Sequence, residues 1–414
     1  MAARRPAGWQ LSLQPPAFSY QPSMIPLRLV PHQTHRCLDG HPWVFRSELA
    51  PEGLAGAGDG DAVEVQDQRG RALGRGFYSA HSQIAVRLCA RGAVLLDEGF
   101  LRQRLGAALA HRAARLPGRQ ALRLVSSEGD LLPGLIVERF ADRLVVQALT
   151  AGIERRLGAI VDLLSELCAP AQIVERSDGR GRELEGLPAR AGVLTGPADT
   201  HVRVQLGAVD LDVDLLDPHK TGAYLDQIES HRALAAWTPP GGRVADVFAH
   251  RGGFALHLLQ AGAGAAVAVD QSAAGLADAA AAAARLGYRL HAATADAFAW
   301  LRGEVAAGSR YDLVVLDPPA FARTRAAVPG ALRGYRDLHL QALRLLPPGG
   351  RLASWSCSSH VSTDEFLATA VSAAAELRRT LRHDAAFDQP ADHPWLPAAP
   401  ETRYLKGFLV TVLD

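Results

Sequence analysis

The chain has 414 residues, of which 48% are hydrophobic and 21% charged, and its formal net charge is only +1. This length allows two or three domains with a large buried core, and this composition excludes a disordered or fibrous chain. No apolar run reaches the ~18 residues that a membrane span needs, and the first twenty residues lack the apolar segment of a secretory signal. Four cysteines far apart in sequence form no C-x-x-C pair, so we predict no metal site, no disulfide framework and a cytoplasmic protein.

The first half of the chain predicts three successive parts. Residues 1–23 contain four prolines and few periodic apolar positions, so we interpret them as a flexible extension or a misassigned start. Residues 24–97 predict a small β-barrel-like module, with strands at 62–66, 72–78 and 84–88. Residues 98–215 predict a mixed α+β domain. Its elements are helices at 100–115 and 153–167, a hairpin-like pair at 121–125 and 134–149, and strands near 173 and at 202–213.

The last part, residues 216–414, alternates strand and helix from about residue 230. The predicted strands are 243–248, 265–270, 289–292, 311–317 and 351–357, followed by a closing pair near 381 and at 404–412. This alternation is typical of a doubly wound parallel sheet. The predicted fold class is therefore α/β, a Rossmann-like sheet with a β-barrel-like N-terminal module and a middle α+β domain.

Acidic residues lie at the ends of the first three predicted strands of this sheet, where open α/β sheets bind ligands. Asp246 precedes a glycine pair that opens a helix, and Asp270, 24 residues later, is placed to accept both hydroxyls of a ribose. Asp296 either accepts an exocyclic amine or caps the next helix. The loop lacks G-x-G-x-x-G, so a dinucleotide is a poor fit, and we predict a pocket for an adenosine with an amino-acid tail. The predicted site comprises Asp246, Phe248, Gly252, Asp270, Gln271, Asp296 and Ala297.

The fourth and fifth strands end in motifs that suit a flat base and a nucleophile. The fourth ends in Asp317-Pro318-Pro319-Ala320-Phe321, where two prolines hold a carboxylate and an aromatic ring in place. The fifth ends in Ser356-Cys357-Ser358-Ser359-His360, which brings a thiol to the same cleft. A lone cysteine is often a small core residue, but the serines and the histidine make these surroundings polar.

Methyl transfer to carbon 5 of cytosine explains this pair of residues. That carbon is a weak nucleophile until a thiolate adds to carbon 6, and the pKa of the thiol must be depressed for the thiolate to be available. We therefore predict Cys357 as the nucleophile and Asp317 as the residue that holds the base at its N3 and amino edge. The base that removes the carbon 5 proton stays open between His360 and a water molecule.

The chain resembles the bacterial PUA-domain methyltransferases that use S-adenosylmethionine to make 5-methylcytosine in large-subunit ribosomal RNA. The resemblance covers nearly everything after residue 24 and implies the fold, the cofactor, the RNA partner and the nucleophile role of Cys357. The matching segments are His41-Pro42-Trp43-Val44-Phe45, residues 83–88, Glu128-Gly129-Asp130-Leu131-Leu132-Pro133-Gly134-Leu135, Lys220-Thr221-Gly222-Ala223-Tyr224-Leu225-Asp226-Gln227, Gly252-Gly253-Phe254, Asp317-Pro318-Pro319 and Ser356-Cys357-Ser358.

Several positions depart from the family pattern, which has cations after Gln227 and after the prolines. Here Ile228, Ser230 and His231 follow the first motif, Ala320 follows the second, and His250-Arg251 stand where the family has Tyr-Thr. Arginine serves phosphate as well as lysine does. We therefore expect RNA contacts from Lys220, Arg251, Arg323 and Arg325. A PUA-like module implies binding to structured RNA, with Trp43 and Phe45 filling the small barrel rather than stacking on a base.

Two other functions fit parts of the sequence. An amino-directed RNA base methyltransferase would need only the Asp-Pro-Pro loop, and Cys357 would then be structural. A catalytically silent RNA-binding or assembly protein would explain the missing cations. The appended module makes a small-molecule methyltransferase a weaker hypothesis. The residues name neither the modified nucleotide nor the oligomeric state, and a homodimer stays open.

Overall fold

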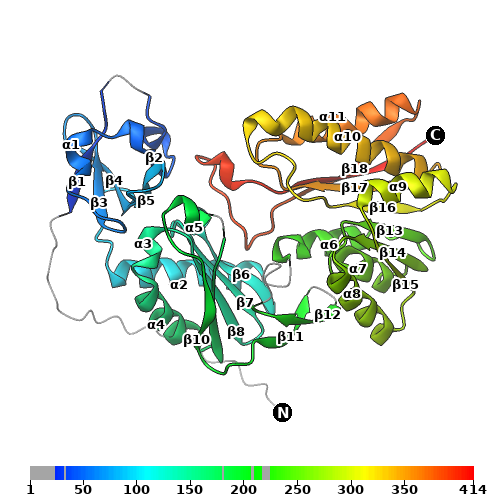
Figure 1. Ribbon diagram of the computed structural model, residues 1–414, viewed down its shortest axis with the longest axis horizontal. Coiled ribbons are helices and arrows are strands. Elements are labelled where there is room, and N and C mark those ends of the chain that lie inside the picture. Colours follow the sequence, from blue (N-terminus) through cyan, green and yellow to red (C-terminus); the bar gives the residue numbers. More distant parts are fainter. Residues whose placement is uncertain (1–23, 32–33, 180, 207–208, 217–223) are drawn as a thin grey trace, which may run out of the picture.

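The computed structural model describes residues 24–31, 34–179, 181–206, 209–216 and 224–414. These residues form two five-stranded sheets, a two-stranded hairpin and a seven-stranded sheet, arranged as three lobes (Figure 1). The predicted extension 1–23 and Lys220 lie outside the described residues. No described helix has both the length and the apolar character that crossing a membrane requires.

The N-terminal lobe is a five-stranded sheet in the order β1-β3-β4-β5-β2. Alternation in β3 buries Val63 and Val65 against Val86, so the period-2 pattern of the sequence sets the inner face. Gly76 is required in β4, because a Cβ there would lie 2.0 Å from the carbonyl oxygen of Arg87. The elements are β1 (Ile25–Arg28), β2 (Trp43–Phe45), α1 (Pro51–Leu54), β3 (Ala62–Gln66), β4 (Ala72–Tyr78) and β5 (Ile84–Ala90).

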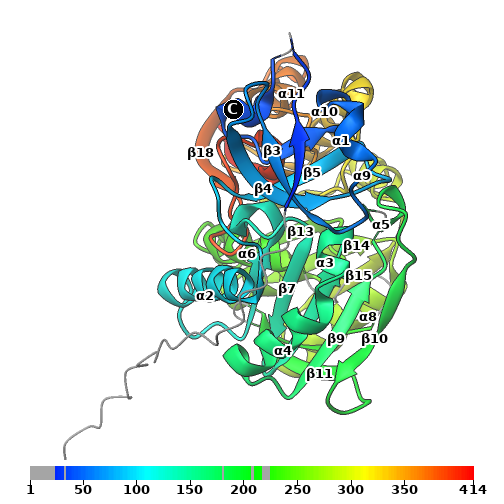
Figure 2. The same ribbon diagram turned by 90° about the vertical axis from the view of Figure 1, so that its left-hand side faces the viewer.

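The middle lobe is a second five-stranded sheet, β10-β9-β8-β7-β6, with α2 and α4 packed on it (Figure 2). The segment 134–149, predicted as one arm of a hairpin-like pair, is two antiparallel strands. Its turn passes through Ala141 at φ 54°, a conformation that few non-glycine residues adopt. The elements are α2 (Glu98–Arg115), β6 (Ala121–Ser126), β7 (Leu135–Phe140), β8 (Arg143–Ala148), α3 (Ala151–Glu154), α4 (Leu157–Cys168), β9 (Gln172–Ser177), α5 (Gly181–Leu184) and β10 (Arg190–Thr195).

The predicted helix 153–167 is interrupted between α3 and α4. Arg156 leaves helical geometry there, and its guanidinium donates to the carbonyl oxygens of Gly60 and Gly152 and lies 3.9 Å from the ring centroid of Phe77. The contacts with Gly60 and Phe77 link this break in the helix to the first lobe. The predicted strand 202–213 is the hairpin of β11 (His201–Leu206) and β12 (Val209–Asp214), which packs between the middle sheet and α8 (Ala273–Leu286).

The third lobe is a seven-stranded sheet in the order β15-β14-β13-β16-β17-β19-β18, with β19 antiparallel to both of its neighbours. Helices α6, α7 and α8 cover one face, and α9, α10 and α11 cover the other (Figure 1). The strand order reverses between β13 and β16, where doubly wound sheets bind ligands, so the predicted fold class is confirmed. The remaining elements are α6 (Ile228–Ala235), β13 (Arg243–Val247), α7 (Gly253–Gln260), β14 (Ala265–Asp270), β15 (Leu290–Thr294), α9 (Ala297–Ala306), β16 (Leu313–Leu316), α10 (Val328–Leu345), β17 (Arg351–Ser356), α11 (Thr363–Glu376), β18 (Leu381–Asp388) and β19 (Lys406–Val412).

Three strands of this sheet end one residue earlier than predicted. Phe248 leaves extended geometry at φ 68°, and the N–H of Asp317 still bonds to Val247 before two prolines, which lack a donor, stop the ladder. Cys357 likewise follows its strand. Each of these side chains therefore lies on the loop that leaves the sheet edge.

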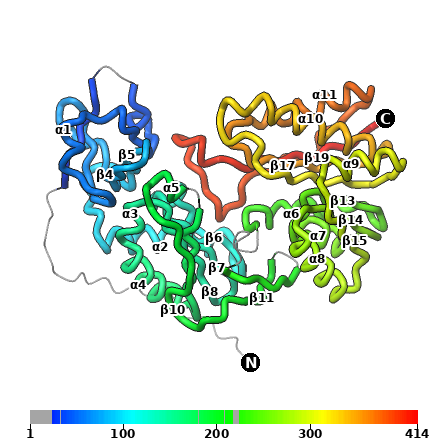
Figure 3. The backbone as a smooth tube through the Cα atoms, in the orientation of Figure 1, coloured from blue at the N-terminus to red at the C-terminus, as the bar shows by residue number. Residues whose placement is uncertain are grey.

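The returning loop, residues 389–405 between β18 and β19, reaches back to the other two lobes (Figure 3). Glu401 accepts a 2.5 Å hydrogen bond from Arg36 of the N-terminal lobe. The backbone oxygen of Asp392 accepts one of 2.8 Å from the buried Arg112 of α2, whose guanidinium also pairs with Asp130. Arginine can donate to several acceptors at once, so these hydrogen bonds connect the seven-stranded sheet, through the loop, to the N-terminal and middle lobes.

Candidate active site

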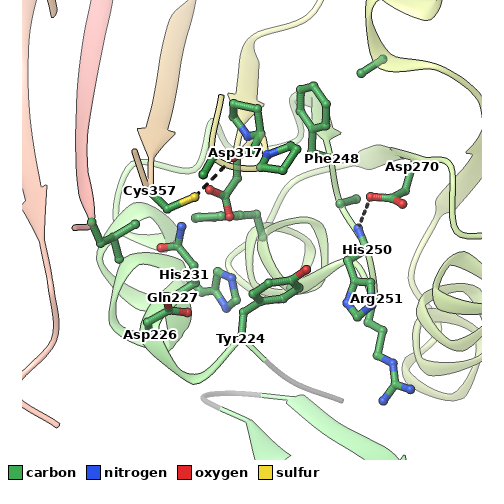
Figure 4. Close-up of a pocket in the computed structure, with 18 of the residues that line it drawn as sticks. Tyr224, Asp226, Gln227, His231, Phe248, His250, Arg251, Asp270, Asp317 and Cys357 are labelled. Atoms are coloured by element: carbon green, nitrogen blue, oxygen red, sulfur yellow. Dashed lines mark hydrogen bonds between the residues drawn. The ribbon is translucent and has the colours of Figure 1, made fainter. Parts of the chain in front are cut away.

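A cavity of about 680 Å³ opens at the carboxyl edge of the seven-stranded sheet, between the ends of β13 and β16 (Figure 4). This volume lies within the range of small-molecule sites. Side chains from five strand ends and from the segments before α6 and β19 line it. They include Tyr224, Asp226, Gln227, His231, Phe248, His250, Arg251, Asp270, Gln271, Asp296, Ala297, Phe298, Asp317, Phe321, Arg323, Cys357, Tyr404 and Leu405.

Asp270, at the end of β14, is held by two backbone donors. Its Oδ2 accepts from the N–H of His250 at 2.9 Å and its Oδ1 from the N–H of Ser272 at 2.8 Å. Each carboxylate oxygen has a second lone pair, so the group is oriented and can still accept hydroxyl protons. These free acceptor positions are compatible with the predicted contact to ribose hydroxyls, which stays a prediction.

Asp296 lines the cavity and also caps a helix, so the predicted cap is present, and its contact with an exocyclic amine stays a prediction. Its Oδ1 accepts from the N–H of Ala299 at 2.9 Å, which makes it the N-cap of α9, and its Oδ2 accepts from Gln271 at 3.3 Å. Ala297 and Phe298 continue this wall. The carboxylate is therefore fixed beside an aromatic surface that suits an adenine ring.

Asp246 and Gly252, both predicted to contact the cofactor, do not line the cavity. Asp246 is fully buried, its Oδ2 accepts from the N–H of Ala255 at 2.9 Å, and burial raises its pKa to about 7. Gly252 has φ 70° and precedes α7, and a Cβ there would lie 2.9 Å from that of Ala279. The side chain of Asp246 points into the protein interior from β13, and Gly252 packs against α8. Both residues therefore support the loop beneath the cavity and do not form its wall.

The loop between β13 and α7 turns sharply, because three of its residues have positive φ. Phe248, His250 and Gly252 adopt φ values of 68°, 48° and 70°. The guanidinium of Arg251 pairs with Asp278 of α8 at 3.3 Å. Its side chain lines one side of the cavity but is only 11% exposed.

Cys357 and Asp317 line the same cavity from neighbouring loops (Figure 4). The Sγ of Cys357 lies 4.0 Å from the carbonyl oxygen of Pro318, and the side chain is half-buried. Cys89, by contrast, lies in the core, where burial raises the pKa of its thiol to about 12. Cys357 therefore belongs to the wall of the cavity rather than to an aliphatic core.

A hydroxyl network anchors the Cys357 loop. The Tyr335 hydroxyl of α10 lies 2.9 Å from the Oγ of Ser356 and 3.0 Å from that of Ser358. Ser358 also accepts from the N–H of Ala322 at 3.1 Å, which links this loop to the one that carries Asp317. The predicted polar surroundings of the thiol are thus structural supports for the loop.

Tyr224 lies at the centre of the cavity, between the predicted cofactor side and the predicted catalytic side. Burial raises its pKa to about 12, and the next contributions come from Asp317, Asp270, Asp226 and Cys357. Tyr224 and these four groups all line the same cavity. Sequence reasoning assigned no role to Tyr224, although it stands in a segment that carries the family resemblance.

Tyr404 and His231 are further cavity residues that sequence reasoning missed. The Tyr404 hydroxyl donates to Asp226 at 2.8 Å, across 178 positions of sequence. Tyr404 belongs to the returning loop, and no local sequence pattern predicts that this loop reaches the cavity. His231 packs edge-on against Phe254, at 4.3 Å between ring centroids, and burial lowers its pKa.

The predicted RNA-binding residues separate into different environments. Arg323 is exposed and lines the mouth of the cavity, whereas Arg325 is exposed outside it. Arg251 is engaged with Asp278, and Lys220 lies outside the described residues. His360, one candidate for the proton-removing base, is exposed and does not line the cavity. In the described ranges, no group of three or more His, Cys, Asp or Glu is arranged to hold a metal ion.

Comparison with known proteins agrees with this geometry. Residues 27–91 match the family model of PUA-like domains, and residues 189–402 match that of S-adenosylmethionine-dependent methyltransferases. The ribosomal RNA large subunit methyltransferase I of Photobacterium profundum is 38% identical, over 89% of this chain and 94% of that one. The protein of the same name from Aeromonas hydrophila is 38% identical, over 92% and 98%.

A solved chain described as a SAM-dependent methyltransferase from Streptococcus mutans shares the fold. It has a TM-score of 0.79 at 18% identity, covering 94% of this chain and 100% of that one. The two sequence relatives and the two family matches together span nearly all of the described lobes. The chain therefore belongs to the family of the ribosomal RNA large subunit methyltransferases I, with a PUA-like domain, and its cofactor is S-adenosylmethionine.

Proposed function

We propose that this protein methylates carbon 5 of a cytosine in large-subunit ribosomal RNA through a covalent adduct with Cys357. The relatives' names support the RNA class, which also implies action in the cytoplasm. The observation that carries the proposal is that Cys357 and Asp317 line one cavity together with Asp270. A thiol, a base-holding carboxylate and a ribose-binding carboxylate then serve one reaction.

The residues around Asp270 fit the cofactor. Asp270 would hold the ribose hydroxyls, Asp296 the exocyclic amine, and Phe248 and Phe298 the faces of the adenine ring. When bound, S-adenosylmethionine supplies an electrophilic methyl group. Tyr224 and the loops of Asp317 and Cys357 line the same cavity as Asp270, so they would enclose the cofactor's methyl group together with an extruded base.

The residues on the other side fit the target base. The Cys357 thiolate adds to carbon 6, which makes carbon 5 nucleophilic, while Asp317 accepts from the amino edge and keeps the ring in plane. After the methyl group is on carbon 5, a base takes the carbon 5 proton and the carbon–sulfur bond breaks; a water molecule fits this role better than His360, which does not line the cavity. The electron pair returns to the sulfur, and the thiolate is regenerated. Arg323 at the cavity mouth would contact RNA phosphate, a charge interaction that weakens with salt.

The test replaces Cys357 by alanine and measures methyl transfer from labelled S-adenosylmethionine to ribosomal RNA, with the product nucleoside identified by mass spectrometry. We expect C357A to lose at least ~1,000-fold of the activity while still binding S-adenosylmethionine. Cys168→Ala is the matched control, since Cys168 lies on α4 in the middle lobe. Retained formation of 5-methylcytosine would contradict the adduct, and an N4-methylated product would support the amino-directed alternative.

A further inference from the structure

Lys406 lies directly beside the Cys357 loop. It begins β19 and is paired in register with Ser356 of β17, one residue before the thiol. Its Nζ donates to the carbonyl oxygen of Ser358 at 2.6 Å and to that of Tyr404 at 3.2 Å. Lys406 therefore contacts the chain on both sides of Cys357. Its backbone pairs with Ser356, and its ammonium group hydrogen-bonds to the carbonyl oxygen of Ser358.

This lysine is buried without a charged partner. The residue is only 6% exposed, and it is one of two lysines in the whole sequence. Among the described residues, its hydrogen bonds go to the two backbone carbonyl oxygens and it forms no ion pair with a carboxylate. An ammonium group has three N–H donors, so one is left that these hydrogen bonds do not use. A buried and unpaired cation is costly, which calls for a functional explanation.

Of the described groups that favour the protonated form of Lys406, the thiolate of Cys357 has the largest influence. Burial lowers the pKa of Lys406 to about 8, and the largest opposing influence is Cys357, ahead of the carboxylates of Asp388 and Glu365. The influence of Arg403 is repulsive. At neutral pH the lysine therefore remains mostly protonated, and the group that gains most from its charge is the sulfur.

We propose that Lys406 is a positioning residue that stabilises the thiolate form of Cys357 and fixes the loop that carries it. The inference rests on the proposed role of Cys357. The thiol proton leaves to solvent, Lys406 keeps its own protons, and the thiolate carries the electron pair that forms the bond to carbon 6. When that bond breaks, the pair returns to the sulfur, and the nearby ammonium group stabilises the thiolate again.

Other charged and titratable groups face the thiol from the surrounding elements. Tyr224 and Tyr335 lie close enough to the thiol for its charge to affect them, and Asp317 lines the same cavity. Asp317 carries a negative charge and opposes formation of a thiolate, and a phenol adds no positive charge. Among the residues that the structure describes, Lys406 is therefore the cation that we expect to favour the thiolate of this cysteine.

The experiment measures the pH dependence of the thiol directly. The full chain is alkylated with iodoacetamide between about pH 6 and 9, and mass spectrometry follows the peptide that contains Cys357, with no RNA and no cofactor present. Cys168 is an internal control in every sample, because burial raises the pKa of its thiol and it lies far from Lys406. The variants are K406M, K406Q and K406R, with R403M as a matched removal of a neighbouring, half-exposed cation.

We expect K406M and K406Q to slow alkylation of Cys357 about tenfold at pH 7 and to move its midpoint upward by about one pH unit. K406R restores most of the rate because it keeps the charge, and R403M leaves the profile unchanged. K406Q keeps a hydrogen-bond donor, so it separates the effect of the charge from that of loop support. It also replaces K406M as the test variant if K406M does not fold.

An unchanged profile in K406Q would overturn the inference, as would a shift in K406R equal to that in K406M. Because no methyl transfer is measured, a shifted profile stands even if C357A proves active. In that case the proposed adduct fails, whereas the influence of Lys406 on the thiol does not. If C357A loses activity and the K406Q profile is unchanged, the proposed adduct stands and the inference about Lys406 fails.

Discussion

The Oγ of Ser358 accepts a hydrogen bond from the backbone N–H of Ala322, 3.1 Å away. This contact joins the two loops that carry the proposed nucleophile and the proposed base-holding acid, although 36 positions separate them in sequence. Tyr335 completes the junction by bonding to the serines on either side of Cys357. The relative position of Cys357 and Asp317 is therefore set by a buried polar network.

Replacing Tyr335 by phenylalanine tests this network. The change leaves two buried serine hydroxyls short of a partner, so we expect the free energy of unfolding to fall by about 1–2 kcal/mol in urea titrations. The rate of methyl transfer falls as well, because the two loops lose their common support. Tyr288→Phe is the control, since the Tyr288 hydroxyl makes no hydrogen bond within the described ranges, and we expect a change below about 0.5 kcal/mol there. Equal stability of the two variants would contradict the role of the network.

Replacing Asp270 by asparagine tests the cofactor side of the cavity. The carboxylate is oriented by the N–H groups of His250 and Ser272, and an amide would turn a donor toward one of them. We expect the dissociation constant for S-adenosylmethionine to rise about 10- to 100-fold in calorimetry, the value of hydrogen bonds to a charged group. Asp364→Asn, on the exposed first turn of α11, should bind as the wild type does. Unchanged affinity in D270N would remove Asp270 from the site.

Gly253 tests how tightly the loop before α7 is packed. A Cβ at this position would lie 2.4 Å from the imidazole Cε1 of His231, so we expect Gly253→Ala to cost about 1–3 kcal/mol of stability and to weaken cofactor binding. The double variant G253A/H231A should recover part of both losses, because the clashing ring is gone. Gly106→Ala, where a Cβ meets nothing within 4 Å on α2, serves as the control and should be stabilising. Additive losses in the double variant would show that the clash is not the cause.

Asp246 gives the protein a pH dependence of defined sign. Burial raises its pKa to about 7 from an ordinary value near 3.8, so between these values the folded chain holds a proton that the unfolded chain has released. Its contribution to stability is therefore complete below about pH 4 and is lost as the pH rises toward 7, by at most about 1.4 kcal/mol per pH unit. We expect the free energy of unfolding of Asp246→Asn, measured in urea, to rise relative to that of the wild type as the pH increases from 5 to about 8. Parallel pH profiles of the two proteins would contradict this ionisation.

The sheets were predictable where local periodicity decides the structure. The strands 62–66, 72–78 and 265–270 lie where the alternation or the apolar run placed them. The hairpin within 134–149 was not predictable, because its turn uses Ala141 at positive φ rather than a glycine. The break after α3 depends on contacts of Arg156 with another lobe, which no local pattern contains.

The site was predictable to the extent that parallel strands bring their carboxyl ends to one edge. That rule placed Asp270, Asp317 and Cys357 together. It also placed Asp246 there, wrongly, because β13 is buried on both faces and its sequence gives no sign of which side chains turn inward. Tyr404 and Lys406 escaped prediction because the returning loop is directed by distant contacts, such as the one between Arg112 and Asp392.

The proposed adduct can be trapped with a ribosomal RNA fragment in which cytosine is replaced by 5-fluorocytosine. Fluorine at carbon 5 cannot leave as a proton, so the carbon–sulfur bond formed by the thiolate should persist after methyl transfer. We predict a denaturation-resistant complex of protein and RNA that requires S-adenosylmethionine, with the nucleotide mass on the peptide containing Cys357. Methylation of unsubstituted RNA by the same preparation, without any trapped complex or with the nucleotide on another residue, would contradict the account.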